Sequence, residues 1–256
     1  MRRASTCLAL VGLVVFALTS VASAVPVVTL KAQPVAIPGF PHTGNHKGAG
    51  AAAQAEFTIS GTEYAGFPPP LIGVNFFLPT GSKINSKGFK KCSVEALKNT
   101  GPKACPKGSA AGPVGHAEGV VRFGKGEPTK EQVTIESFFT ANGLAFYTEG
   151  HSPVQLEFVS PGNYVNLGGA AGFGPELKTE VPLVETVPGA PDASVEKINV
   201  KVGSAIKSKG KTTYYGTLPK TCKGSWKGKA ELMFAGLGGL TPQTVTVPYK
   251  LPCPKN

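Results

Sequence analysis

Apolar and polar residues alternate in several short segments of this 256-residue chain. In one of them Val154, Leu156 and Phe158 alternate with Gln155 and Glu157. A strand that packs one face on a core and exposes the other has this period of two. The alternation therefore predicts an antiparallel sheet with one buried face. Similar segments lie at residues 56–59, 197–202 and 244–250.

Apolar runs between turn residues predict further strands. They lie at residues 27–30, 72–78, 114–123, 133–139, 144–148 and 229–234. Gly and Pro occupy 33 and 23 positions, which favours short strands joined by turns over long helices. One short helix is expected at Ser93–Lys98, where Ser93 can cap the first turn and Glu95 lies within it. The sequence thus predicts an all-β fold, an antiparallel β-sandwich of one large or two packed units.

Two parts of the chain resemble each other, which raises the hypothesis of a duplication. Residues 75–88 resemble residues 199–210 after a two-residue gap. Cys105-Pro-Lys-Gly-Ser resembles Cys222-Lys-Gly-Ser, and each is followed by an Ala-Glu pair and an apolar run. The expected organisation is a signal peptide at 1–24, a Pro/Gly-rich extended arm at 25–50, β-unit one at 51–125, an intervening β-hairpin segment at 126–174 and β-unit two at 175–256.

The first 24 residues have the organisation of a secretory signal peptide. Arg2 and Arg3 precede the apolar run Leu8–Leu18, and Ala22-Ser23-Ala24 supplies small residues at the cleavage position. The run is shorter than the roughly 20 residues that a membrane-spanning helix needs. We therefore expect cleavage after Ala24 and a secreted, extracellular or cell-envelope location.

Four cysteines follow the signal peptide, and an even number in an exported protein indicates two disulfides. No two of them have the C-x-x-C spacing of a zinc site. A hairpin centred on Gly238 would place Cys222 and Cys253 nearly opposite each other, as a disulfide requires. Of the three possible pairings, this favours Cys92–Cys105 together with Cys222–Cys253.

Lysines concentrate in two blocks. Residues 83–107 hold seven Lys and one Glu, and residues 197–229 hold nine Lys and no acid. The interval 126–185 instead holds eight Glu and two Lys. The formal net charge is +11, and it falls to +9 when Arg2 and Arg3 leave with the signal peptide. The candidate polyanion-binding residues are Lys83, Lys87, Lys90, Lys91, Lys207, Lys209 and Lys211.

The chemistry of lysine narrows the choice of partner. Flexible ammonium groups give a diffuse positive field that suits an anionic cell-wall polymer or a membrane surface. Base reading and bidentate phosphate contacts favour arginine, so sequence-specific recognition of nucleic acid is disfavoured. The competing interpretation is a solvated lysine face that keeps the protein soluble.

Catalysis is the main alternative class of function. Glu136, Glu149 and Glu157 on neighbouring strands, with Tyr147 and His151 nearby, would suit a hydrolase acting on polysaccharide. Glutamate on the solvent face of an antiparallel sheet is common, however, and the Gly-x-Ser-x-Gly nucleophile motif is absent from the sequence. The expectation is a non-catalytic protein without a metal site or cofactor.

A third hypothesis is a neutral glycan-binding module that uses exposed aromatic rings. Tyr214, Tyr215 and Trp226 lie in or near the second lysine block and are its candidate contacts. Retention on polysaccharide that does not depend on salt would distinguish this module from a polyanion binder.

Three local features give the chain a resemblance to known proteins. They are the Gly-Phe-Pro-Pro-Pro turn at Gly66–Pro70, the Leu-Pro-Thr-Gly strand end at Leu78–Gly81 and the paired cysteines with Cys105-Pro-Lys-Gly-Ser. With them the chain resembles uncharacterised secreted β-rich proteins of high-GC Gram-positive bacteria over most of its mature length. The resemblance implies an extracellular β-protein and brings no activity, ligand or catalytic residue.

Overall fold

The computed structural model describes residues 25–122, 127–185 and 192–254. Within them, eleven strands form one large sheet and four short strands form two separate pairs. The large sheet contains β1 (Val27–Val35), β2 (Ala52–Ser60), β3 (Leu71–Pro79), β5 (Gly115–Arg122), β6 (Pro128–Phe139), β7 (Gly143–Gly150), β8 (Leu156–Asn166), β9 (Phe173–Glu180), β10 (Ser194–Val202), β14 (Ser225–Phe234) and β15 (Gln243–Pro252). The pairs are β4 (Lys83–Ile84) with β13 (Gly216–Thr217), and β11 (Ala205–Ser208) with β12 (Lys211–Tyr214).

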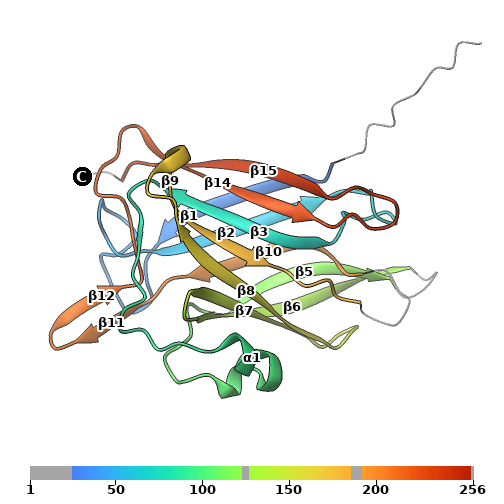
Figure 1. Ribbon diagram of the computed structural model, residues 1–256, viewed down its shortest axis with the longest axis horizontal. Coiled ribbons are helices and arrows are strands. Elements are labelled where there is room, and N and C mark those ends of the chain that lie inside the picture. The colour runs from blue at the N-terminus through green and yellow to red at the C-terminus, as the bar shows by residue number, and fades with distance from the viewer. Residues whose placement is uncertain (1–24, 123–126, 186–191, 255–256) are drawn as a thin grey trace, which may run out of the picture.

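The large sheet curls until its two edges meet. Its strand order is β1-β2-β10-β5-β6-β7-β8-β9-β3-β14-β15, and every neighbouring pair is antiparallel. The edge strands β1 and β15 contact each other along a seam (Figure 1). Because the number of strands is odd, the two seam strands run in the same direction. The result is a nearly closed barrel whose opposite walls face each other across one core.

The predicted fold class is confirmed. The structure is nearly all β, its sheet is antiparallel, and two disulfides brace it. The strand predicted at residues 27–30 is the first half of β1. On the side of the seam, β14 and β2 pack against each other as the two layers of a sandwich do.

The alternation along the strands places the core inside the barrel. On β14, Ala230, Leu232 and Phe234 point inward and are fully buried. They pack against Phe57 and Ile59 of β2 on the other side of the seam. Burying a large apolar side chain stabilises the fold by roughly 1.5 to 3 kcal/mol, so this cluster holds the two edges of the sheet together.

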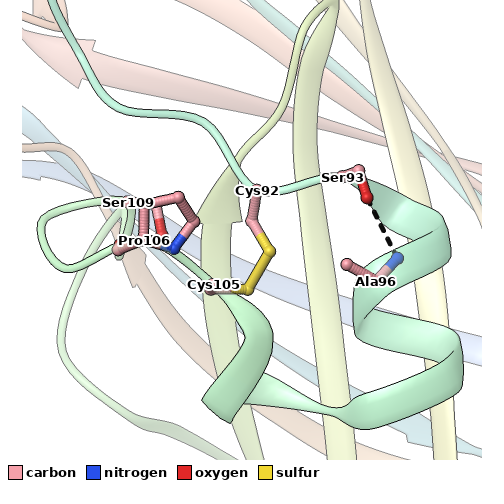
Figure 2. The surroundings of a disulfide bond; sticks show 6 residues. All are labelled: Cys92, Ser93, Ala96, Cys105, Pro106 and Ser109. Carbon is pink, nitrogen blue, oxygen red and sulfur yellow. Dashed lines mark hydrogen bonds between the residues drawn. A yellow bond between two sulfur atoms is a disulfide. The ribbon is translucent and has the colours of Figure 1, made fainter.

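The first disulfide fixes the predicted helix to the outside of the barrel (Figure 2). Cys92 and Cys105 are bonded, with their Cα atoms 5.0 Å apart. Helix α1 (Val94–Thr100) lies between them, and a 3₁₀ turn (Pro102–Ala104) follows it. Leu97 of α1 is fully buried against the outer faces of β6, β7 and β8. The predicted helix and this disulfide pairing are confirmed.

Ser93 is the N-cap of α1, and its Oγ accepts a hydrogen bond of 3.0 Å from the backbone N–H of Ala96 (Figure 2). Replacing Ser93 by alanine leaves that N–H without its acceptor. We expect the free energy of unfolding to fall by about 1 kcal/mol. Urea denaturation of the S93A variant measures the loss, and S93T, which keeps a hydroxyl, is the control. Equal stability of S93A and the wild type would contradict the capping role.

The second disulfide closes the last hairpin, also as predicted. Strands β14 and β15 pair in register from Ser225 opposite Pro252 to Phe234 opposite Gln243. Cys222 and Cys253 lie just beyond the open end of this hairpin, with their Cα atoms 5.8 Å apart. The bond therefore secures the final strand at the seam of the barrel.

The strands of the two expected units are interleaved in the one sheet. Strand β10 of unit two lies between β2 and β5 of unit one, and β3 of unit one lies between β9 and β14 of unit two. The intervening segment contributes β6, β7 and β8 as a meander. Two copies that exchange their second strand would produce this order, and the duplication itself stays a hypothesis.

Among the described residues, no helix is long and apolar enough to cross a membrane. The predicted signal peptide and its cleavage site lie outside the described residues. Two disulfides are compatible with an extracellular location, because such bonds form and persist in oxidising compartments.

Candidate functional site

The structure brings the two lysine blocks together at one end of the barrel (Figure 1). Strand β4, at the start of the first block, pairs with β13, and Lys83 lies opposite Thr217. The backbone N–H of Asn85 donates to the carbonyl of Tyr215 over 2.8 Å. The β11–β12 hairpin, which carries lysines of the second block, therefore lies beside the loop after β4. We call the two adjoining segments, residues 83–91 and 205–217, the basic end.

A cluster of aromatic rings anchors both segments to the barrel. Phe89 from the first segment contacts Tyr215 from the second, with ring centroids 5.5 Å apart. Both rings pack on Phe139 at the end of β6, at 4.9 and 4.3 Å. All three side chains are buried, so packing rather than charge holds the basic end in place.

This cluster corrects the expectation of exposed aromatic residues. Tyr215 and Trp226 are 2% and 5% exposed, because Tyr215 packs on Phe139 and the Trp226 Nε1–H donates to the Thr221 carbonyl over 2.7 Å. Tyr214 is half-buried. Two of the three rings proposed for glycan binding are therefore inside the protein, and the expectation that Tyr215 and Trp226 are exposed is wrong.

The seven candidate lysines are exposed, and the salt bridges found among the described residues involve other lysines. Lys207 lies over the ring of Phe40 at 5.5 Å, and the Lys91 Nζ donates to the Ala141 carbonyl over 3.4 Å. Charges closer than the Debye length of about 8 Å reinforce one another in physiological salt. Lysines gathered on two adjoining segments thus create one positive field.

Charge is divided between the two ends of the barrel. The segments between strands on the side of the basic end, residues 36–51, 80–114, 140–142, 167–172 and 203–224, contain thirteen Lys and one acid, Glu95. The described segments at the opposite end contain no lysine. Their acids are Glu63, Glu127, Glu185 and Asp192. The described loops therefore give the barrel a positive end and a negative end.

The three candidate catalytic glutamates lie around Tyr147 on the outer wall. Glu136 is opposite Tyr147 in the β6–β7 ladder, and Glu149 is opposite Glu157 in the β7–β8 ladder. His151 Nε2 lies 3.6 Å from a carboxylate oxygen of Glu149. The sequence correctly placed these residues on neighbouring strands.

Tyr147 is the buried member of this group and lies beneath the C-terminal end of α1. Its burial, its hydrogen bond to Glu157 and the neighbouring carboxylates raise the pKa of its hydroxyl far above the usual value. A general acid or base works best with a pKa near the operating pH. Tyr147 therefore suits a structural role as a hydrogen-bond donor to Glu157.

The interior of the barrel contains a cavity of about 300 Å³ that is partly open to the surface. Its wall is mostly apolar, and several inward side chains are only half-buried because they face this space rather than one another. Examples are Val74, Phe76, Phe146, Phe158 and Val200. Sequence reasoning missed the cavity, because alternation marks which residues point inward and not whether they meet.

The cavity extends between the two ends of the barrel. Ser82 and Lys83 line it at the basic end, and Leu183 and Val184 line it at the opposite end. Lys83 is also exposed, so its side chain belongs both to the cavity lining and to the surface of the basic end. Glu131, near the opposite end, is 2% exposed, and its carboxyl accepts a hydrogen bond of 3.0 Å from the Val154 N–H.

Two further searches, for metal-binding residues and for similar proteins, gave no candidate among the described residues and no match. No group of three or more potential ligands that could hold a metal ion occurs among the described residues. Comparison with family models, with curated protein sequences and with solved structures finds no match. The functional argument therefore rests on the geometry of the basic end and of the cavity.

Proposed function

We propose that this chain is an exported, non-catalytic binding protein that attaches to an anionic cell-wall polymer or membrane surface through its basic end. The observation that supports the proposal is the meeting of the two lysine-bearing segments of the basic end, which lie more than 100 residues apart in the sequence. Lysines spread only for solubility have no need to converge on one end of a barrel whose other end is acidic.

The kind of contact follows from the residues at the surface. The basic end offers exposed ammonium groups on flexible stems, which suit a dense array of phosphate or carboxylate groups. Tyr215 and Trp226 are buried, so neither ring offers a face on which a base could stack. The proposal therefore favours a surface or polymer over a single-stranded nucleic acid.

The test is retention on purified cell-wall material and on anionic liposomes. Each lysine close to an anionic membrane contributes about 1 kcal/mol, so removing four is expected to weaken retention between about 100- and 1000-fold. Retention of the wild type should fall steeply between about 50 mM and 500 mM salt, because screening shortens the reach of the charges. The variant carries Gln at Lys87, Lys90, Lys207 and Lys209.

A matched control loses the same net charge from the barrel wall. Its four lysines each form a salt bridge with a glutamate, so they contribute little to the outer field. The control is expected to keep most of the retention. An equal loss in both variants would show that only net charge matters, and no retention of the wild type at low salt would refute the proposal. The control carries Gln at Lys31, Lys130, Lys178 and Lys197.

A further inference from the structure

The interior of the barrel has the properties of a ligand site, independently of the proposed surface attachment. Protein interiors are normally close-packed, with few voids larger than a water molecule. This one holds a cavity of about 300 Å³, at the lower bound of small-molecule sites. An apolar cavity of about 150 Å³ stays dry and binds benzene, so a larger one accepts a longer hydrocarbon.

The shape of the cavity favours a chain over a ring system. The strands around it have 8 to 12 residues, which at about 3.4 Å per residue gives walls of roughly 27 to 40 Å. Residues at both ends of the barrel line the cavity, from Lys83 to Leu183. An extended aliphatic chain along the barrel axis would contact Phe76, Phe146 and Val200 on different walls.

The charges at the two ends orient such a chain. The exposed Lys83 lines the cavity at the basic end and is the only lysine among the described residues of its lining. Two acids line the cavity: Glu118 is paired with Lys197 at 3.6 Å, and Glu131 is buried near the opposite end. A negatively charged head group is therefore favoured beside Lys83 and disfavoured at the far end. A few convergent hydroxyls, from Thr148, Ser160 and Thr179, complete the lining.

We propose that the barrel holds the aliphatic tail of one anionic single-chain amphiphile, with the head group beside Lys83 at the basic end. The apolar wall recognises the tail, and the ammonium group of Lys83 recognises the head. The ligand class includes free long-chain carboxylates and single-chain lipids with a phosphate head group. Both share a negative charge at one end of a hydrocarbon chain.

The first experiment compares probes on the intact mature protein. Isothermal titration with dodecanoate and with dodecyl phosphate, each below its micelle concentration, is expected to give one site, and native mass spectrometry should show one bound molecule. Dodecan-1-ol, which has the same tail without the charge, is expected to bind about tenfold more weakly. A preference between the two anions identifies the head group. Equal binding of dodecan-1-ol would overturn the role of the basic end, and absence of binding by all three would overturn the site.

The second experiment uses two variants with matched controls. Val200→Phe fills the cavity and is expected to weaken dodecanoate binding at least tenfold, whereas Val165→Phe adds the same ring to an exposed position on β8. Lys83→Gln removes the head-group contact, whereas Lys87→Gln removes a charge from the same loop outside the cavity lining. Circular dichroism confirms that each variant is folded.

The variants separate this inference from the proposed function. Lys83→Gln and Lys87→Gln lower the charge of the basic end equally, so they should change retention on anionic liposomes equally. Only Lys83→Gln should weaken dodecanoate binding, by about three- to tenfold. If both weaken it equally, or if Val200→Phe binds like the wild type, the amphiphile does not occupy the barrel.

Discussion

Replacing Phe234 by alanine is expected to lower the free energy of unfolding by about 3 to 5 kcal/mol. Phe234 ends β14, is 0% exposed and packs in the cluster that joins β14 to β2 across the seam. It does not line the cavity, so removing its ring creates a new void where the interior is filled. Urea denaturation followed by the buried Trp226 fluorescence measures the loss.

Val165 provides the control for Phe234. It lies on β8 and is 38% exposed, so Val165→Ala should change stability by less than about 0.5 kcal/mol. A loss below about 1 kcal/mol for Phe234→Ala would mean that the seam is loosely packed. That result would be compatible with β14 as a strand, but it would contradict a tightly packed core across the seam.

Local patterns predicted much of the fold. The alternation at residues 229–234 predicted β14, and the Gly-rich turn centred on Gly238 predicted the hairpin and its disulfide. Ser93 followed by Glu95 predicted the start of α1. These features depend on contacts between residues close in sequence, or on turn geometry, and both are visible in a single chain.

The order of the strands in the sheet could not be predicted from short sequence patterns. Nothing in the sequence of β10 indicates that it pairs with β2, more than 130 residues away, because any strand with one apolar face fits many neighbours. The sequence repeat holds part of this information. Residues 81–88 and 203–210 are identical at six of eight positions without a gap.

That alignment makes Phe77 and Asn199 equivalent positions. Phe77 lies opposite Lys229, and Asn199 lies opposite His116. Lys229 and His116 are themselves equivalent, since each precedes an Ala-Glu pair. Matching positions therefore have matching partners, which is the register that two exchanged copies would have. The repeat was recognised as a hypothesis of duplication, but not as a rule for pairing.

The sequence likewise predicted one part of the candidate site and not the other. The lysine blocks were visible as composition, and the seven candidate lysines chosen from them are exposed. Their meeting depends on Phe89 and Tyr215, whose contact joins segments 126 positions apart. Tyr215 was expected at the surface because it lies among lysines, and it is buried because its ring packs on Phe139. Composition therefore identified the lysine-rich segments, and packing between residues far apart in the sequence determined where those segments lie.

Loss of the Cys222–Cys253 disulfide is expected to lower the free energy of unfolding by about 3 to 4 kcal/mol. The bond closes a loop with a sequence separation of 31, and the loop-entropy relation gives this value for that length. The Cys92–Cys105 bond closes a loop of 13, so its loss should cost about 3 kcal/mol or less. Double serine variants of each pair, compared in urea with and without reductant, measure the two effects separately. The larger loss should accompany the C-terminal pair, because β15 is an edge strand that pairs only with β14 and otherwise relies on the seam. If the N-terminal pair proves the more costly to remove, the anchoring of α1 rather than closure of the barrel limits stability.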